Sequence, residues 1–183
     1  MTTIIGISGS LRKGSFNAAL LRAAAELAPE TCTVKIISIS GIPLYNADVE
    51  ESEGIPGVAA EIKDAIAAAD GLLMVTPEYN NALPGVFKNA IDWLSRPADD
   101  IPRVFGDLPV GLIGATPGGF GTILSQTAWL PVLRFLGTRP WLGKQLYVGG
   151  AMNLFDKSGH LKDDEMRKRL AAYLKGFVAF IEG

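Results

Sequence analysis

The chain has 183 residues, of which 48% are hydrophobic, and a formal net charge of −2 at pH 7. This length predicts a single domain over residues 1–183, with enough apolar residues for a sizeable core. A charge so close to zero argues against a nucleic-acid partner. The single cysteine, Cys32, excludes an internal disulfide and a cysteine-based zinc site, and it fits a reducing cytoplasm. No signal peptide and no run of about 18 apolar residues is visible, so no membrane partner is expected.

Short apolar runs alternate with helical patterns along the chain. In the first half we expect strands at 3–7, 33–39 and 72–75, helices at 17–28, 58–69 and 84–95, and a long connection at 41–57. In the second half we expect a loop at 96–108, a strand at 110–113, a helix at 122–136 that Pro131 kinks or divides, a strand within 138–148, and a last helix from 163 to about 181.

Five strands interleaved with five helices predict an α/β fold with an open parallel sheet and helices on both faces. With five strands, the flavodoxin-like order 2-1-3-4-5 is the better fit, and its topological switch point lies between the first and third strands. Ligands bind where the loops after those two strands diverge. The loops after residues 7 and 75 should therefore face each other.

The loop from Gly6 to Asn17 follows the first strand and carries small residues, hydroxyl groups and two cations. Ser8, Ser10 and Ser15 can donate hydrogen bonds, and the next helix presents free N–H groups and its positive dipole end to the loop. Its glycine spacing fits neither a P-loop nor a dinucleotide fingerprint. A site for a terminal phosphate monoester, such as that of FMN, remains, with an ordinary turn as the alternative.

Two more loops at the same sheet edge have unusual composition. The loop after the third strand brackets Tyr79, Asn80 and Asn81 between Pro77 and Pro84, which makes a rigid polar segment beside an aromatic ring. The loop after the fourth strand is Ala115-Thr-Pro-Gly-Gly-Phe-Gly121, whose N–H groups can form a nest for negative charge. Three such loops together predict a site for a planar, phosphorylated heterocycle.

These motifs resemble the NADPH-dependent FMN reductase family, and most closely its bacterial quinone and chromate reductase branch. The resemblance rests on Gly9-Ser-Leu-Arg-Lys-Gly-Ser-Phe-Asn17, on Thr76-Pro-Glu-Tyr-Asn80, and on Leu83-Pro-Gly-x-x-Lys-Asn-Ala-Ile-Asp-Trp-Leu94, and it runs from about Ile4 to Phe180. It implies a flavodoxin-like fold, bound FMN, a homodimer or homotetramer, and two-electron reduction of small acceptors by NAD(P)H.

The resemblance also implies which residues bind the cofactor. The phosphate loop would contribute Ser8, Ser10, Leu11, Arg12, Ser15, Phe16 and Asn17. The ring and ribityl side would be bound by Pro77, Glu78, Tyr79, Asn80 and Asn81, and the pyrimidine end by Thr116, Pro117, Gly118 and Gly119. The chain departs from many relatives at Asn81 and at Thr116-Pro117, and Pro117 removes one N–H donor.

The chemistry would belong to the flavin, so no catalytic side chain and no metal are expected. Tyr79 and Glu78 line the site, and Glu78 is either a proton donor or a hydrogen-bond anchor. Arg96 and Tyr45 are candidate substrate-binding residues, with Arg96 alternatively a partner of its helix C-terminus. His160 lies in a turn-like segment and is expected at the surface.

The predicted function is hydride transfer from NAD(P)H to quinones, with chromate, ferric chelates and azo compounds as further acceptors. Two alternatives remain: a one-electron carrier, which would usually be strongly acidic around the flavin, and a reductase of free flavin. A phospho-receiver regulator would need acidic residues where Ser8-Gly-Ser10 and Thr76-Pro77 stand. We also expect a homodimer in which the 41–57 segment, or the face bearing Trp93, closes over the partner's flavin.

Overall fold

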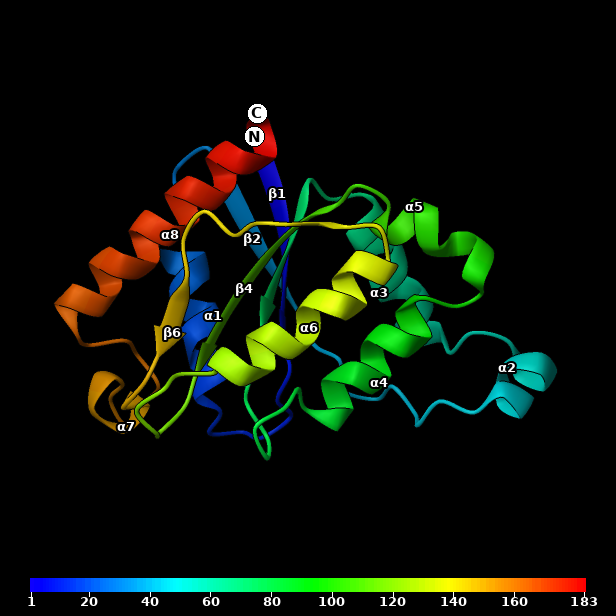
Figure 1. Cartoon of the computed structure of the whole chain (residues 1–183), viewed down its shortest axis with the longest axis horizontal. Coiled ribbons are helices and arrows are strands. Elements are labelled where there is room, and N and C mark those ends of the chain that lie inside the picture. Colours follow the sequence, from blue (N-terminus) through cyan, green and yellow to red (C-terminus); the bar gives the residue numbers. More distant parts are fainter.

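A computed structural model describes all 183 residues and contains one parallel sheet (Figure 1). The strands run in the order β2-β1-β3-β4-β5, with β6 also paired to β4. This order confirms the predicted flavodoxin-like arrangement. The strand bounds are β1 (Thr2–Ser8), β2 (Cys32–Ile37), β3 (Gly71–Val75), β4 (Pro109–Ala115), β5 (Arg139–Pro140) and β6 (Leu146–Val148).

The last position in the sheet is divided between two short strands. Val110 of β4 is in register with Pro140 of β5, and Ile113 of β4 is in register with Leu146 of β6. Residues 141–145 leave the sheet between them. A strand was expected somewhere within 138–148 without definite limits, and the interruption is the physical reason that no continuous strand pattern exists there.

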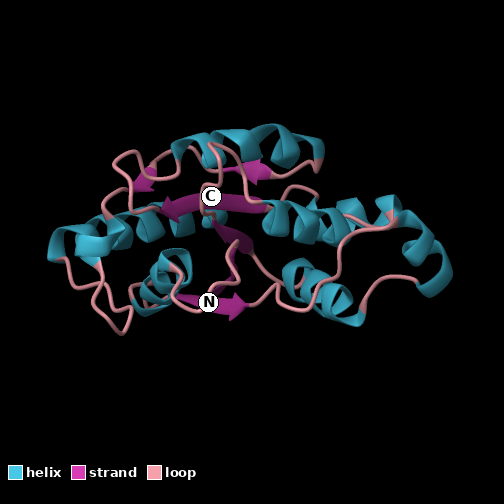
Figure 2. Cartoon of the chain, turned by 90° about the horizontal axis from the view of Figure 1, so that it is seen from below, coloured by secondary structure: helices cyan, strands magenta, loops and turns pink.

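Helices cover both faces of the sheet, as Figure 2 shows. One face packs against α1 (Phe16–Glu26) and α8 (Asp164–Glu182), and the other against α3 (Gly57–Ala67), α4 (Gly85–Leu94), α5 (Ile101–Phe105) and α6 (Ile123–Phe135). Each face encloses a hydrophobic cluster, because the strand residues alternate between them: Leu73 and Val75 lie in one cluster, Leu72 and Met74 in the other. No helix is both long enough and apolar enough to span a bilayer.

Two segments expected to be loops contain helices. Within 41–57 lies α2 (Ala47–Glu53), whose N-cap Asn46 accepts a hydrogen bond from the Asp48 amide through its side chain. Within 96–108 lie a 3₁₀ turn, η1 (Ala98–Asp100), and α5, which buries Val104 and Phe105. A short helix α7 (Ala151–Leu154) follows β6. The helix α6 continues through Pro131 as one helix instead of dividing there.

A buried charge cluster joins α3 to η1 and α5. Lys63 on α3 is 4% exposed, its ammonium lies 2.7 Å from an Asp100 carboxylate oxygen, and it also donates to the Arg96 carbonyl. Arg103 donates two hydrogen bonds to the same carboxylate, at 2.6 and 2.8 Å. The hydrogen bonds from Arg103 and Lys63 hold the pKa of Asp100 well below its usual range.

We therefore predict that Asp100→Asn destabilises the protein in a pH-dependent way. At pH 7 the free energy of unfolding should fall by on the order of 3 kcal/mol, because Lys63 keeps its charge without its carboxylate partner. Because the folded pKa of Asp100 is depressed, its contribution is present above the unfolded pKa of about 3.9 and is lost as the pH falls further. Urea unfolding should therefore show the gap between variant and native protein narrowing below about pH 4.

The neighbouring Asp99 provides a matched control, because it is exposed and forms no ion pair. Asp99→Asn should change the unfolding free energy by less than about 0.5 kcal/mol at any pH. A gap for Asp100→Asn that stays constant from pH 7 to pH 3 would contradict the assignment.

Candidate active site

The loops after β1, β3 and β4 meet at the carboxyl edge of the sheet, at the bottom of the view in Figure 1. They enclose a cavity of about 300 Å³. Its lining brings together ten of the predicted site residues and one that was not predicted, Ala115: Ser10, Arg12, Ser15, Phe16, Asn17, Pro77, Glu78, Tyr79, Ala115, Thr116 and Pro117. Residues up to about 100 positions apart in the sequence thus form one pocket.

The N-terminus of α1 gives the pocket its anion-binding side. Ser15 is the N-cap of α1, and its hydroxyl oxygen accepts from the Ala18 amide at 3.2 Å, which leaves its proton free to donate. The amide N–H groups of Phe16 and Asn17 find no acceptor within the chain. Arg12 lies beside them, with its guanidinium over the Phe16 ring and one N–H donated to the Gly14 carbonyl. Free donors, a helix dipole and a cation make a phosphate site.

Asn17, a predicted phosphate contact, also joins the start of α1 to the end of β4. Its side chain is 4% exposed, donates to the Ala115 carbonyl at 2.9 Å and accepts from the Ala115 amide at 2.9 Å. Both polar ends of the amide therefore bond to the end of β4. Asn17 lines the pocket and joins α1 to β4, and the second N–H of its side-chain amide has no acceptor within the chain.

The loop after β3 forms a small hairpin at the mouth of the pocket. Tyr79 and Ala82 pair through both backbone hydrogen bonds, at 3.1 and 3.0 Å. The two central residues, Asn80 and Asn81, have φ of 51° and 60°, the conformation that favours asparagine in two-residue hairpin turns. Tyr79 is 47% exposed and lines the pocket, whereas Asn80 and Asn81 do not line it. The amides of Glu78, Asn80 and Asn81 have no acceptor within the chain.

A buried hydroxyl fixes the start of this hairpin. Thr76 is fully buried, its hydroxyl lies 2.8 Å from that of Ser125, and it accepts from the Trp129 indole N–H at 3.0 Å. Both partners belong to α6. This cluster could not be predicted from the sequence, because Ser125 and Trp129 have the pattern of ordinary helix positions. The cluster holds the loops after β3 and β4 at a fixed separation.

Glu78 is a hydrogen-bond anchor. One carboxylate oxygen accepts from the Leu124 amide at 2.9 Å and from the Ser125 amide at 3.1 Å. These are first-turn N–H groups of α6, where a carboxylate also interacts favourably with the helix dipole. Of the two roles expected for Glu78, the structure supports the anchor.

The loop after β4 forms the third wall. Thr116 and Pro117 line the pocket, and Gly118 and Gly119 follow at its rim without lining it. The Gly118 carbonyl accepts from the Gly150 amide, while the amides of Gly119 and Gly121 find no acceptor in the chain. Gly114 lets this wall approach the neighbouring loop, because a Cβ there would lie 2.2 Å from the Thr76 carbonyl oxygen. Of the two residues with free amides, Gly119 is exposed, and Gly121 is buried against Tyr147.

Besides Asn80, Asn81, Gly118 and Gly119, four more predicted residues lie outside the pocket. Ser8 has a buried hydroxyl with no hydrogen-bond partner at the end of β1, and Leu11 is exposed beside the phosphate loop. Arg96 does not reach the pocket: its guanidinium donates to both carboxylate oxygens of Glu50, at 3.0 and 2.8 Å, and lowers the pKa of that carboxyl. Tyr45 packs edge-on against Trp93 and donates its hydroxyl to Glu50. In the chain by itself, Arg96 is thus engaged by Glu50 and not by the pocket.

His160 is exposed, as expected, and its Nδ1 lies 2.6 Å from the Ser158 hydroxyl, away from the pocket. No group of three histidine, cysteine or acidic side chains could hold a metal ion. The chemistry of the pocket is therefore that of hydrogen-bond donors around a bound group.

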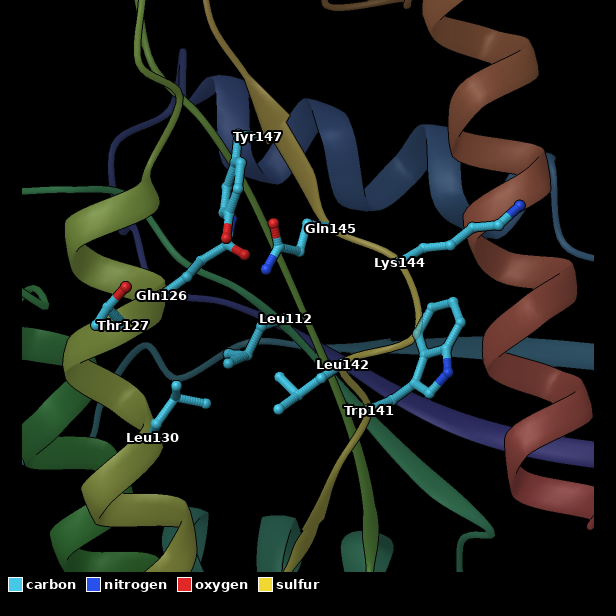
Figure 3. Close-up of a pocket in the computed structure, with 9 residues that line it drawn as sticks. All are labelled: Leu112, Gln126, Thr127, Leu130, Trp141, Leu142, Lys144, Gln145 and Tyr147. Carbon is cyan, nitrogen blue, oxygen red and sulfur yellow. The ribbon is translucent and has the colours of Figure 1, made fainter.

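A second cavity lies between α6 and the segment that interrupts the edge strand, and Figure 3 shows its lining. It measures about 90 Å³, compared with about 300 Å³ for the pocket at the sheet edge. Its one cation, Lys144, extends toward α8 and away from the cavity (Figure 3). With no cation directed inward and no helix N-terminus, this cavity does not suit a phosphorylated cofactor.

A flavodoxin-like sheet with a phosphate cradle at its switch point defines a flavin mononucleotide-binding protein. The family model for NADPH-dependent FMN reductase matches residues 2–153. The chain belongs to this family.

Individual relatives agree over nearly the whole chain. An NAD(P)H-dependent FMN reductase of Pseudomonas aeruginosa is 40% identical and is aligned over 97% of this chain and 94% of its own. A 2-hydroxy-1,4-benzoquinone reductase of Burkholderia is 37% identical, over 96% and 93%. The solved structure of FerB, a flavoenzyme NAD(P)H:acceptor oxidoreductase from Paracoccus denitrificans, superposes with a TM-score of 0.88 at 31% identity, covering 100% of this chain and 98% of the other.

The expected class is thus confirmed: the chain is an FMN-dependent oxidoreductase that uses NAD(P)H. The residues present fit FMN on structural grounds. The cradle at Ser15 offers free donors and a cation for the phosphate, the exposed Tyr79 offers an aromatic face for the ring, and the rim at Gly119 offers N–H groups.

Variants at Ser15 and Asn17 test whether each side chain binds the phosphate directly or supports the structure of the site. Ser15→Ala removes a donor to the phosphate and should weaken FMN binding roughly tenfold to a hundredfold, because a hydrogen bond to a charged group contributes about 1.5–3 kcal/mol. Riboflavin, which lacks the phosphate, should lose much less affinity. Fluorescence titration of the apoprotein with both ligands measures the difference.

Asn17→Ala should behave differently, because it leaves the Ala115 amide and carbonyl without partners. We expect a loss of unfolding free energy of about 1–3 kcal/mol and similar losses of affinity for FMN and riboflavin. If Asn17→Ala instead weakened FMN alone, Asn17 would be a phosphate contact after all.

Proposed function

We propose that the protein transfers two electrons, as a hydride, from NAD(P)H to quinones through bound FMN. The observation that carries the proposal is the pocket itself. It combines a phosphate cradle, an exposed aromatic residue and unpaired backbone N–H groups, while its one carboxylate, Glu78, is committed to α6. A site of this kind holds a cofactor and leaves the redox chemistry to it.

FMN, when bound, would supply the two-electron hydride chemistry. The residues of the chain would bind the FMN and stabilise the negative charge that develops on it. Ser10, Arg12 and Ser15 would bind the phosphate, together with the free amides at the start of α1. The free amide at the exposed Gly119 would stabilise negative charge on the pyrimidine edge, which a fixed donor does without reorganisation. Pro117 contributes no N–H, so the donor to the pyrimidine edge would be a glycine that follows it.

Quinones are the acceptor class best supported. They are planar and apolar, so they suit the exposed face of Tyr79 at the pocket mouth. One relative is named for the reduction of a benzoquinone. Chromate, ferric chelates, azo compounds and free flavin would reach the same open side as secondary acceptors.

A one-electron carrier of the flavodoxin type is the alternative function. The pocket disfavours it, because Arg12 lines the site and Lys13 lies beside it, where a carrier would present acidic residues to its protein partners. Turnover of NAD(P)H with a quinone and no partner protein would exclude the carrier function. Its absence would overturn the proposal.

With a single open side, nicotinamide and quinone should bind in turn. Initial rates at several quinone concentrations should give parallel reciprocal plots, the ping-pong pattern, and the quinone should appear as quinol. The measurement is stopped-flow or steady-state absorbance of NAD(P)H at fixed quinone. Converging lines would mean that both substrates bind together, and would refute a shared binding position.

We also propose that the protein is a homodimer. A groove of about 360 Å³ between α4 and α6 is lined by Ile91, Pro131, Val132 and Leu136, and Phe135 beside them is 80% exposed. The groove runs along the C-terminal halves of both helices, away from the pocket loops at which they begin. The exposed Leu44 and Tyr45 run along α4, since the Asn89 side chain bonds the Tyr45 amide. Trp93 is fully buried and is not itself a contact.

The dimer predicts the effect of a charge in the groove. Phe135→Glu should shift the protein to monomer in sedimentation velocity while FMN content is kept. Lys175→Glu on α8, also exposed, is the matched control and should leave the sedimentation coefficient unchanged. Native protein that sediments as a fully active monomer would refute the dimer.

We place the protein in the cytoplasm, on the evidence of one free cysteine and no disulfide.

A further inference from the structure

Another pocket, distinct from the two cavities described above, lies on the other side of the phosphate loop. It measures about 250 Å³ and shares Ser15 and Phe16 with the FMN pocket. Its remaining walls are the start of α1, with Ala19 and Arg22, and the loop at 155–159. The Phe16 ring separates the two, because Arg12 lies over it and Phe155 packs against it at 5.8 Å. The FMN phosphate loop is thus bordered by two cavities.

The charge around this pocket is positive. Lys13, Arg22 and Lys157 line it, and none of the three lies in an ion pair. Asp156 is the one acidic residue in the lining. Three cations and one carboxylate leave a net charge of about +2, which matches a phosphate monoester dianion at neutral pH.

The carboxylate of Asp156 is already engaged by its own loop. One of its oxygens accepts from the Ser158 amide, the Ser158 hydroxyl and the His160 amide, at 2.9, 2.6 and 2.9 Å. These bonds from Ser158 and His160 lower the pKa of Asp156 to about 2, so it stays ionised and shapes the loop. The carboxylate does not pair with Arg22, and all three cations remain available to a ligand.

Gly159 lies beside the guanidinium of Arg22. Its φ is +84°, and a Cβ there would lie 2.7 Å from Arg22 Nη2. The positive φ favours glycine at this position, and the Arg22 guanidinium lies close to the loop backbone at the wall of the pocket.

We propose that this pocket binds the 2′-phosphate of NADPH and so favours NADPH over NADH. The inference rests on the proposed function, which needs a nicotinamide dinucleotide at the adjacent pocket. The FMN phosphate occupies the Ser15 cradle, and the 2′-phosphate is the one phosphate monoester that distinguishes NADPH from NADH. The same charge could bind the adenylate phosphate of FAD or free phosphate, and the test separates these sources.

The test uses FMN-loaded protein with Arg22→Gln and Lys157→Gln combined, since neither residue lines the FMN pocket. The native protein should show a kcat/KM for NADPH at least roughly tenfold above that for NADH. The double variant should lose this preference through NADPH alone, with NADH within about twofold of native and FMN content unchanged. Lys175→Gln, an exposed unpaired cation on α8, should change neither value.

A second readout does not depend on turnover. In calorimetric titration, adenosine 2′-monophosphate should bind to the native protein and to Lys175→Gln but not to the double variant. Adenosine, which lacks the phosphate, should bind to none of the three proteins. Binding of 2′-monophosphate without any oxidation of NAD(P)H would refute the proposed function and support the phosphate site.

Four results would overturn the inference. The first is equal native activity with NADH and NADPH, and the second is an equal loss of activity with both in the double variant. The third is displacement of FMN by FAD that depends on Arg22 and Lys157, while the activity with NADPH does not depend on them. The fourth is inorganic phosphate that binds as tightly as adenosine 2′-monophosphate.

Discussion

The two hydrogen bonds between the Asn17 side chain and the Ala115 backbone hold the site together. They join residues 98 positions apart and set the start of α1 against the end of β4. The free N–H groups of α1 and the glycine-rich rim after β4 must face the same bound molecule, and this side chain fixes their separation. It does so at almost no exposure, where an unpaired amide or carbonyl would cost about 1–3 kcal/mol.

The other loop is held by the same kind of device. The Thr76 hydroxyl and the Glu78 carboxylate both bind α6, one through Ser125 and Trp129 and the other through the first-turn amides. The helix that follows β4 therefore positions the hairpin that follows β3. Rigid support from buried polar bonds lets a site with no catalytic acid or base hold its donors in place before a ligand arrives.

Local patterns were sufficient to predict much of this arrangement. The apolar runs gave the sheet and its order, and parallel strands bring their carboxyl ends together, so the three loops were expected at one edge. The sequence could not show that the side chains of Asn17, Glu78 and Arg96 form hydrogen bonds with distant parts of the chain, because those partners lie 98, 46 and 46 residues away. The helix α2 was missed because it has no buried residue, so its sequence carries no amphipathic pattern.

The interruption between β5 and β6 has a consequence for how the sheet ends. A long, straight edge strand offers a row of unpaired N–H and C=O groups to any other extended chain. Here the outer position beside β4 is filled by segments of two and three residues with residues 141–145 bulging between them. No continuous row of backbone groups is presented on this side, so the sheet cannot be extended strand by strand into a neighbouring molecule. This edge is protected against fibrillar pairing by its own irregularity.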